Sequence, residues 1–228
     1  MYYIIGLFAL FLLARMFVHV FLYYKSAYFK ITNNSYLKMR RDKGRYGEYL
    51  IYGQLKFLEK DGAKFLFNLY IPKADETTEI DVLMIYGSGV YVIENKNYSG
   101  WIFGGENLRT WTQTLPQGKG RAAHKEHFLN PVFQNNLHIK YLRKLLEKDC
   151  AMHSIIVFSN RCVFKKLELD KSIVIHRRDL KGIVQSIDKA VASSLSNKDI
   201  ADLFAKLRPY SNVDEKLRQQ HIANIINK

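Results

Sequence analysis

The amino-acid sequence predicts an α/β protein in which helices flank a mixed β-sheet and one N-terminal transmembrane helix precedes the domain. Three observations support this fold class. Amphipathic and strand-like segments follow one another in the order helix, three strands, helix, two strands, helix, which is typical of a sheet covered by helices. A long apolar segment stands before them. The 228 residues, 48% of them hydrophobic, suffice for one domain with a buried core and exclude a disordered or low-complexity chain.

The charge balance predicts an anionic partner. The chain has 35 Lys and Arg against 21 Asp and Glu, a formal net charge of +14, which favours nucleic acid or the anionic face of a membrane. Its two cysteines, Cys150 and Cys162, exclude a disulfide framework and a four-thiolate zinc site, and they fit a reducing compartment. The sequence also contains no Ser-His-Asp pattern and no phosphate-binding glycine loop.

The N-terminal segment, residues 2–24, is apolar apart from Arg15 and His19, and it is long enough to cross a bilayer as a helix. Tyrosines stand at both of its ends, where aromatic rings favour the lipid headgroup level. Residues 25–43 form a basic juxtamembrane linker that we expect to be attracted to acidic lipid. Positive residues follow the apolar segment, so we expect a single-pass protein of the cell membrane whose C-terminal domain lies in the cytoplasm.

Two alternatives stand beside the membrane span. A cleavable signal peptide carries its positive charge before the apolar stretch, whereas here the charge follows it. A buried helix of a soluble protein would account for the charge of Arg15 and for His19.

The folded domain is expected at residues 44–195, followed by a polar helical extension at 196–228 to which we assign no chemistry. Hydrophobic periodicity and β-branched runs predict its elements. The expected helices are 44–60, 130–148 and 179–192, and the expected strands are 64–71, 79–85, 89–96, 154–159 and 172–176.

A Gly87-Ser88 pair between two strand-like runs predicts a two-residue hairpin turn. This turn places Asp81 directly opposite Glu94, on one face of the sheet, where two like charges repel unless something compensates them. Lys96 lies two residues beyond Glu94 on the same face, with Glu79 opposite it.

A divalent cation is the natural compensation for the two carboxylates. Mg²⁺, or Mn²⁺ in its place, takes oxygen ligands and is typically held by one or two carboxylates and substrate phosphates. The cation would stabilise charge on a phosphoryl oxygen, and Lys96 would position or deprotonate the nucleophile, which predicts phosphodiester hydrolysis. The alternative is a solvated face with an ordinary Glu79–Lys96 cross-strand pair.

Several motifs resemble the nuclease-related domain family. They are Gly47-Glu48, Glu79-Ile80-Asp81, the run GVYVIENKN at 89–97, Trp111, and Asn130-Pro131 followed by Gln134. The family is placed in the PD-(D/E)xK nuclease superfamily. The superfamily's Pro-Asp pair is replaced in this sequence by Ile80-Asp81. The resemblance implies a restriction-endonuclease-like core acting on DNA more than on RNA. It implies Asp81 and Glu94 as metal ligands, Lys96 as the catalytic lysine, Glu48 as an additional ligand and Gln134 as a weaker catalytic candidate; His138, one turn later, reads as a surface residue.

Two tryptophans and three basic residues are considered for nucleic-acid contact. Trp111, like Trp101, could stack on an unpaired base, although core packing is the alternative for both. Basic residues in a Gly-rich loop could hold phosphates, and the alternative is a solvated loop. These residues are Lys119, Arg121 and Lys125.

The sequence and this resemblance therefore predict a membrane-anchored, Mg²⁺-dependent deoxyribonuclease, with endo or exo cleavage left open. One alternative is a catalytically silent, membrane-tethered protein that binds nucleic acid or serves as a scaffold. Another is a peripheral protein whose charge serves anionic lipid alone. No signal of oligomeric state was found in the sequence.

Overall fold

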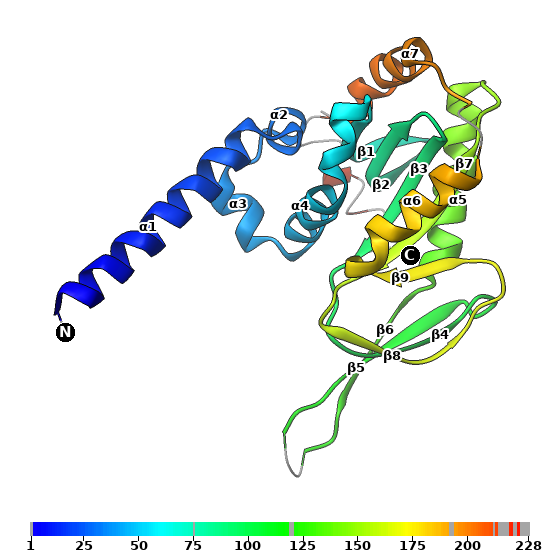
Figure 1. Ribbon diagram of the computed structural model, residues 1–228. Helices are drawn as coiled ribbons and strands as arrows, with labels where there is room; N and C mark the ends of the chain where they lie inside the picture. The colour runs from blue at the N-terminus through cyan, green and yellow to red at the C-terminus, as the bar shows by residue number, and fades with distance from the viewer. Residues whose placement is uncertain are drawn as a thin grey trace.

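A five-stranded mixed sheet forms the centre of the computed structural model, which describes residues 2–74, 76–118, 121–191, 194–211, 213, 219, 220 and 223. The strand order is β1-β2-β3-β7-β9, antiparallel from β1 to β3 and parallel from β3 to β9 (Figure 1). The fold class predicted from the sequence, a mixed sheet flanked by helices after one apolar helix, is confirmed. The strands are β1 (Lys64–Lys73), β2 (Glu76–Tyr86), β3 (Gly89–Lys96), β7 (Met152–Phe158) and β9 (Ile173–His176).

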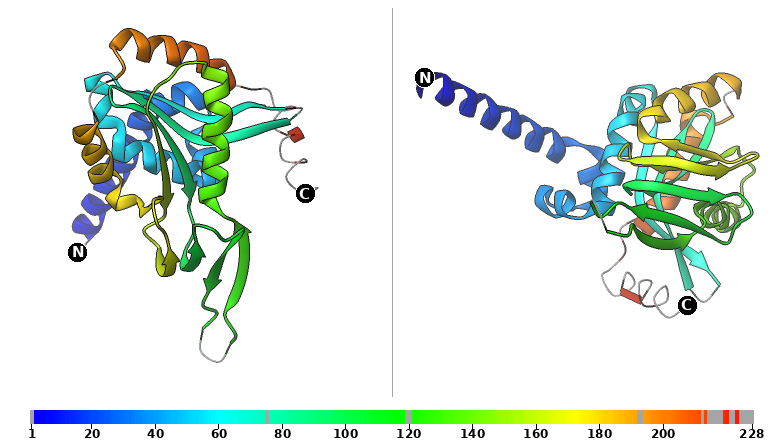
Figure 2. Two further views of the ribbon diagram at one scale, coloured as in Figure 1. Left: turned by 90° about the vertical axis from the view of Figure 1, so that its right-hand side faces the viewer. Right: turned by 90° about the horizontal axis from the view of Figure 1, so that it is seen from below.

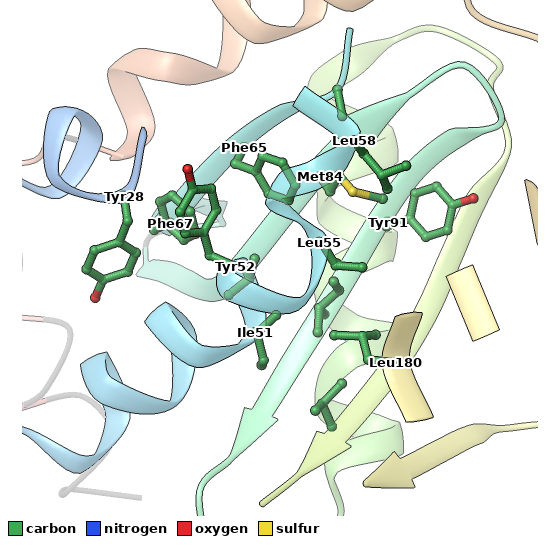
Figure 3. Packing of buried hydrophobic residues seen from close by; sticks show 14 of the residues in the cluster. Tyr28, Ile51, Tyr52, Leu55, Leu58, Phe65, Phe67, Met84, Tyr91 and Leu180 are labelled. Atoms are coloured by element: carbon green, nitrogen blue, oxygen red, sulfur yellow. The ribbon is translucent and has the colours of Figure 1, made fainter. Parts of the chain in front are cut away.

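Helices cover both faces of this sheet. On one face, α4 (Lys43–Leu55) and α6 (Leu180–Ala190) pack in the cluster we call the α4 cluster, together with Phe65, Phe67 and Tyr91 (Figure 3). On the other face, α5 (Pro131–Leu146) and α7 (Asn197–Leu207) pack in the α5 cluster against Leu66, Leu83 and Val92. Short 3₁₀ turns follow or precede these helices at η1 (Lys56–Asp61), η2 (Arg177–Asp179) and η3 (Arg208–Ser211).

The apolar helix α1 (Tyr2–Lys25) extends away from the domain (Figures 1 and 2). Only its last turn is packed: Tyr23 is fully buried in the α4 cluster. The expected linker that follows is folded. It forms α2 (Ala27–Thr32) and α3 (Tyr36–Arg41), because its apolar residues Tyr28 and Met39 are buried in the same cluster.

The expected C-terminal extension also contributes to the core. Helix α7 presents Ile200, Leu203 and Leu207 to the α5 cluster, and all three are buried. Its N-terminus has a capping box in which Ser196 and Asp199 bond reciprocally, the arrangement that stabilises a helix start. The polar residues of this segment are therefore one face of an amphipathic helix.

A second sheet was not predicted from the sequence. Its order is β6-β5-β4-β8, and β5 and β6 form a long hairpin that projects from the domain (Figures 1 and 2). Trp111, Phe158 and Ile102 form a small core between the two sheets. The strands are β4 (Gly100–Gly105), β5 (Thr110–Leu115), β6 (His124–Leu129) and β8 (Cys162–Glu168).

The predicted β2–β3 register is confirmed. Ile85 pairs with Val90, and Tyr86 with Gly89, as the two-residue turn requires. The ladder ends at Val82 and Ile93, so the strands separate where Asp81 and Glu94 follow. The register therefore does not extend to the expected opposition of Glu79 and Lys96.

One position interrupts the pairing of β1 with β2. Phe67 pairs with Val82 and Leu69 with Ile80, but between these pairs Asn68 and Asp81 face each other without a ladder bridge. Asn68 has φ 49°, in the left-handed region that non-glycine residues rarely adopt. The interruption thus lies at the first predicted metal ligand.

Candidate active site

An open cleft of about 390 Å³ lies where β2 and β3 separate, between the start of α5 and the base of β6. Its lining includes Asp81, Lys96 and Gln134, three of the residues predicted from the sequence. Glu79 and His138 line it as well. The structure therefore brings together side chains that are widely separated in the chain.

Asp81 lines the cleft from strand β2. Its Oδ2 accepts a hydrogen bond of 2.8 Å from the backbone N–H of Asn95 on β3. Restricted contact with solvent and the nearby carboxylates of Glu94 and Glu48 raise the pKa of Asp81 well above its usual range. Such a clustering of acidic groups favours binding of a cation, because a cation relieves their mutual repulsion.

Glu94 and Lys96 form an ion pair beside Asp81. The Lys96 ammonium lies 2.6 Å from Glu94 Oε1 and donates to Gln134 Oε1 at 3.0 Å. Burial lowers the pKa of Lys96, but the Glu94 and Asp81 carboxylates outweigh it and leave that pKa above its ordinary value. Lys96 is therefore protonated and acts as a donor.

Helix α5 supplies two side chains to the site, and its start is fixed by Asn130. The Asn130 side-chain oxygen caps α5 by accepting from the Val132 N–H, while its amide donates to three carbonyl oxygens between β4 and β5. This is the physical reason for the Asn130-Pro131 motif: it ties α5 to the second sheet and directs Gln134 to Lys96.

His138 is not the surface residue that the sequence suggested. It is 2% exposed, and its Nδ1 lies 3.6 Å from Glu94 Oε2. Its place one helical turn after Gln134, on the same side of α5, was the available signal. Sequence reasoning missed this neighbour of the predicted ligand because the face of α5 that meets β3 was not identified.

Glu48 lies behind the cleft rather than in it. It is 4% exposed; Oε1 accepts from Asn68 Nδ2 at 3.0 Å, and Oε2 accepts from the Tyr28 hydroxyl at 3.1 Å. Burial raises the pKa of Glu48 to about 7, although the bonds from Asn68 and Tyr28 oppose this. Tyr28 and Asn68, two residues that the sequence did not single out, thus surround a predicted ligand.

Gly47 explains how α4 brings Glu48 to the sheet. A Cβ atom at residue 47 would lie 2.5 Å from the side-chain nitrogen of Asn95, closer than real Cβ contacts allow. A side chain at this position would displace the Asn95 amide, which donates to the Gly44 carbonyl of the same helix at 3.2 Å. In the Gly47-Glu48 motif, the glycine therefore makes room for the Asn95 side chain of β3, and the acidic residue follows it.

The cleft and its surroundings contain oxygen ligands of the kind that a hard cation takes. No group of three or more His, Cys, Asp or Glu side chains in the described part of the chain has metal-binding geometry. Asp81 and Glu94 provide the two carboxylates that suffice for Mg²⁺ when water and phosphate complete its shell. Glu94 Oε2 is buried and accepts no hydrogen bond from the described residues, while His138 Nδ1 lies 3.6 Å from it.

The residues predicted to contact nucleic acid differ in their exposure to solvent. Trp111 is fully buried, its indole N–H donates to the Gly105 carbonyl, and its ring stacks on Phe158 at 6.0 Å; the prediction that it stacks on a base is wrong, because no face is accessible. Arg121 and Lys125 are exposed, and Lys125 lies on strand β6 rather than in a loop. Lys119 lies outside the described residues.

Helix α1 meets the length and hydropathy requirement of a membrane span, with a mean hydropathy of 2.3 over its most apolar window and none of that window buried. By length and composition alone, a signal sequence passes the same test.

Comparison with known proteins places these residues in a family. The model of the nuclease-related domain matches residues 43–159, just over half of the chain. A relative in Bacillus anthracis, an uncharacterized protein, is 29% identical over 189 residues, which cover 82% of this chain and 85% of the relative. No solved structure matches the chain. The matched range begins at α4 and ends after β7, and it contains every residue of the cleft described above; the chain belongs to the nuclease-related domain family.

Proposed function

We propose that this protein is a membrane-anchored, metal-dependent nuclease of the PD-(D/E)xK type that hydrolyses phosphodiester bonds of DNA. The observation that carries the proposal is the junction of β2 and β3, where Asp81 and Lys96 line an open cleft and the buried Glu94 pairs with Lys96. Two carboxylates and an ammonium at one point are the groups that phosphodiester hydrolysis needs.

Asp81 and Glu94 would hold Mg²⁺ or Mn²⁺, and Glu48 acts as the additional acidic group behind them. The bound cation supplies charge stabilisation at the phosphoryl oxygen and a water of lowered pKa. Lys96 donates toward the scissile phosphate or its attacking water, and Gln134 holds the ammonium in place at 3.0 Å.

The nucleic acid would enter along the β5–β6 hairpin. Phe128 and Leu129 at the base of β6 line the cleft, while Lys125 and Arg121 lie farther out on the same projection and are exposed (Figure 2). Basic side chains on a projecting ribbon bind phosphates without reading sequence. We keep Arg121, Lys125 and Lys119 as proposed phosphate contacts and assign DNA over RNA from the superfamily alone.

Helix α1 would anchor the protein in the cell membrane with the domain in the cytoplasm. Its apolar side chains are exposed along its length, and basic residues follow it directly. Exposed apolar surface of this extent is stable in lipid rather than in water, and positive residues at the C-terminal end favour the cytoplasmic side.

The test is cleavage of single- and double-stranded DNA by the full chain in detergent, with Mg²⁺, Mn²⁺ or EDTA. We expect cleavage that needs the cation and is lost in Asp81→Ala and Glu94→Ala, while DNA binding stays intact. Salt-sensitive DNA binding by the wild type without any cleavage would instead establish the catalytically silent binding protein. Binding to anionic vesicles that DNA does not compete away, without DNA binding, would favour the lipid-binding alternative.

A further inference from the structure

We propose that Asn68 is a positioning residue of the active site: with Tyr28 it holds the Glu48 carboxylate beside Asp81. This inference rests on the proposed function. It assigns a role to the one residue of β1 whose backbone departs from a strand, at the position opposite Asp81.

The backbone of Asn68 reverses the order of side chains along β1. Before it, Phe65 and Phe67 point to the α4 cluster and Leu66 to the α5 cluster. After it, Leu69 and Ile71 both point to the α5 cluster, although regular alternation would place them with Phe67. The left-handed conformation at φ 49° therefore shifts the alternation by one residue.

The same shift occurs on β2 across from it. Val82 belongs to the α4 cluster and Leu83 to the α5 cluster, but Ile80 also belongs to the α5 cluster. Asp81 stands at the change. Asn68 and Asp81 face each other without a ladder bridge, so regular strand pairing does not determine the direction of either side chain. Both side chains lie near charged groups.

The consequence for Asn68 is a hydrogen bond to α4. The residue is 8% exposed, and its amide donates to Glu48 Oε1 at 3.0 Å. A left-handed residue in the middle of a strand is unfavourable and persists only where the surroundings determine it; such positions cluster at functional sites. Asparagine tolerates this conformation better than other non-glycine residues, and it also provides the donor.

Tyr28 provides the second donor, and its one hydroxyl hydrogen is shared between Glu48 Oε2 and the Arg45 carbonyl, each 3.1 Å from the hydroxyl oxygen. Its hydroxyl lies 3.1 Å from Glu48 Oε2, and its fully buried ring packs against Phe67 at 4.7 Å and Tyr49 at 5.5 Å (Figure 3). Both Glu48 oxygens are therefore oriented by side chains that are themselves fixed by packing. Partners of this kind around an acidic ligand typically affect metal affinity or activity by ~10–100-fold.

The variants that test this keep the fold. Asn68→Gly retains the left-handed backbone and removes only the amide, and Asn33→Gly is its control, because Asn33 has φ 50° at the exposed end of α2. Tyr28→Phe removes only a hydroxyl, and Tyr52→Phe is its control, because the buried Tyr52 donates to Glu59, outside the cleft.

The measurements are kcat and the Mg²⁺ concentration for half-maximal cleavage, with the full chain in detergent, beside the Mg²⁺-induced shift in Tm. We expect Asn68→Gly and Tyr28→Phe to raise the half-maximal Mg²⁺ concentration or lower kcat by ~10-fold or more, with Tm in EDTA still above the assay temperature, so that the loss is measured on folded protein. If both variants and their controls have the wild-type kcat and half-maximal Mg²⁺ concentration, this inference is overturned while the proposed function still stands. A wild type with neither cleavage nor a Mg²⁺-induced shift would overturn the proposed function and this inference with it.

Discussion

The ammonium of Lys96 lies 2.6 Å from Oε1 of Glu94, and the Glu94 carboxylate is 1% exposed. A buried carboxylate without its partner is strongly unfavourable, so Lys96 has two roles in one position: it neutralises Glu94 in the metal-free protein and offers a proton donor at the cleft. The two roles make separate predictions, because one is measured by stability and the other by turnover.

We expect Lys96→Met to lower kcat by ~10²–10⁴-fold, the usual contribution of a positioned proton donor or acceptor, and to change the half-maximal Mg²⁺ concentration much less. In EDTA its Tm should fall, since Glu94 loses its partner. Lys198→Met is the control, because Lys198 pairs with Asp202 at the same 2.6 Å but on the exposed surface of α7. Unchanged turnover in Lys96→Met would leave the lysine with the neutralising role alone.

Asp81→Asn should stabilise the metal-free protein while it removes activity. The pKa of Asp81 is raised because its charge is poorly solvated and faces Glu94 and Glu48. Asparagine keeps the shape of the side chain and removes the repulsion. The expected result is a Tm in EDTA at pH 8 at or above that of the wild type, with no Mg²⁺-dependent cleavage. A lower Tm would mean that the charge of Asp81 is satisfied in the fold and that the cluster does not await a cation.

The raised pKa of Glu48 predicts that the free energy of unfolding in EDTA depends on pH. Its pKa is about 7 in the folded protein against an ordinary 4.5. The folded state therefore binds more protons between these values, and stability present below pH 4.5 is lost as the pH rises toward 7. The loss is on the order of 3 kcal/mol at most.

Glu48→Gln tests this dependence directly, because the amide cannot ionise. We expect the difference in Tm between Glu48→Gln and the wild type to be small at pH 4.5 and to grow in favour of the variant up to pH 8. Tyr28 can still pair with the amide, since its hydroxyl also lies 3.1 Å from the Arg45 carbonyl and is free to accept. A difference that is constant with pH would contradict the raised pKa.

Trp111 and Trp101 differ in burial, although the sequence allowed both of them the same two roles. Trp111→Phe should lower Tm, because the indole is fully buried, and should leave the affinity for DNA unchanged. Trp101 is 40% exposed on β4 with the ammonium of Lys165 over its ring, so Trp101→Ala should affect stability less. Melting curves and DNA titrations at one salt concentration measure both quantities. A DNA affinity that falls only in Trp111→Phe would contradict the buried position.

The elements around the site could be predicted from the sequence because their signals are local. The Gly87-Ser88 turn determines the β2–β3 register, and the Asn-Pro pair marks the start of α5. The role of Asn68 could not be predicted, because a positive φ within a strand leaves no trace in hydrophobic alternation when the residues on both sides are apolar. His138 was missed for a related reason: its burial depends on which face of α5 meets β3.

The second sheet and the first two helices of the domain needed tertiary information. Strand β6 has an almost wholly exposed pattern, so hydrophobicity could not distinguish it from a loop; its pairing with β5 defines it. The segment after α1 has a basic composition, and a few buried residues such as Tyr28 and Met39 decide its structure. Composition averages over both kinds of residue and therefore predicted a linker.

The last turn of α1 is part of the folded domain, and this predicts where the chain can be shortened. Tyr23 is fully buried; its hydroxyl donates to the Asn34 carbonyl at 2.6 Å, and its ring meets those of Tyr36 and Tyr49 at 5.4 and 5.3 Å. Removing a buried aromatic side chain costs about 3–5 kcal/mol. Tyr23→Ala should therefore lower Tm by roughly 6–20 °C in a protein of this size.

The control is Phe17→Ala, because Phe17 lies on the same helix and is 70% exposed. In detergent we expect its Tm to match that of the wild type. The same argument compares two soluble forms: one that begins at residue 22 retains Tyr23, whereas one that begins at residue 26 lacks it and should melt lower. Equal melting of these two forms would show that the domain is complete without the last turn of α1. Lower melting of the shorter form means that the last turn of α1 and the core around Tyr28 and Glu48 are one packed unit.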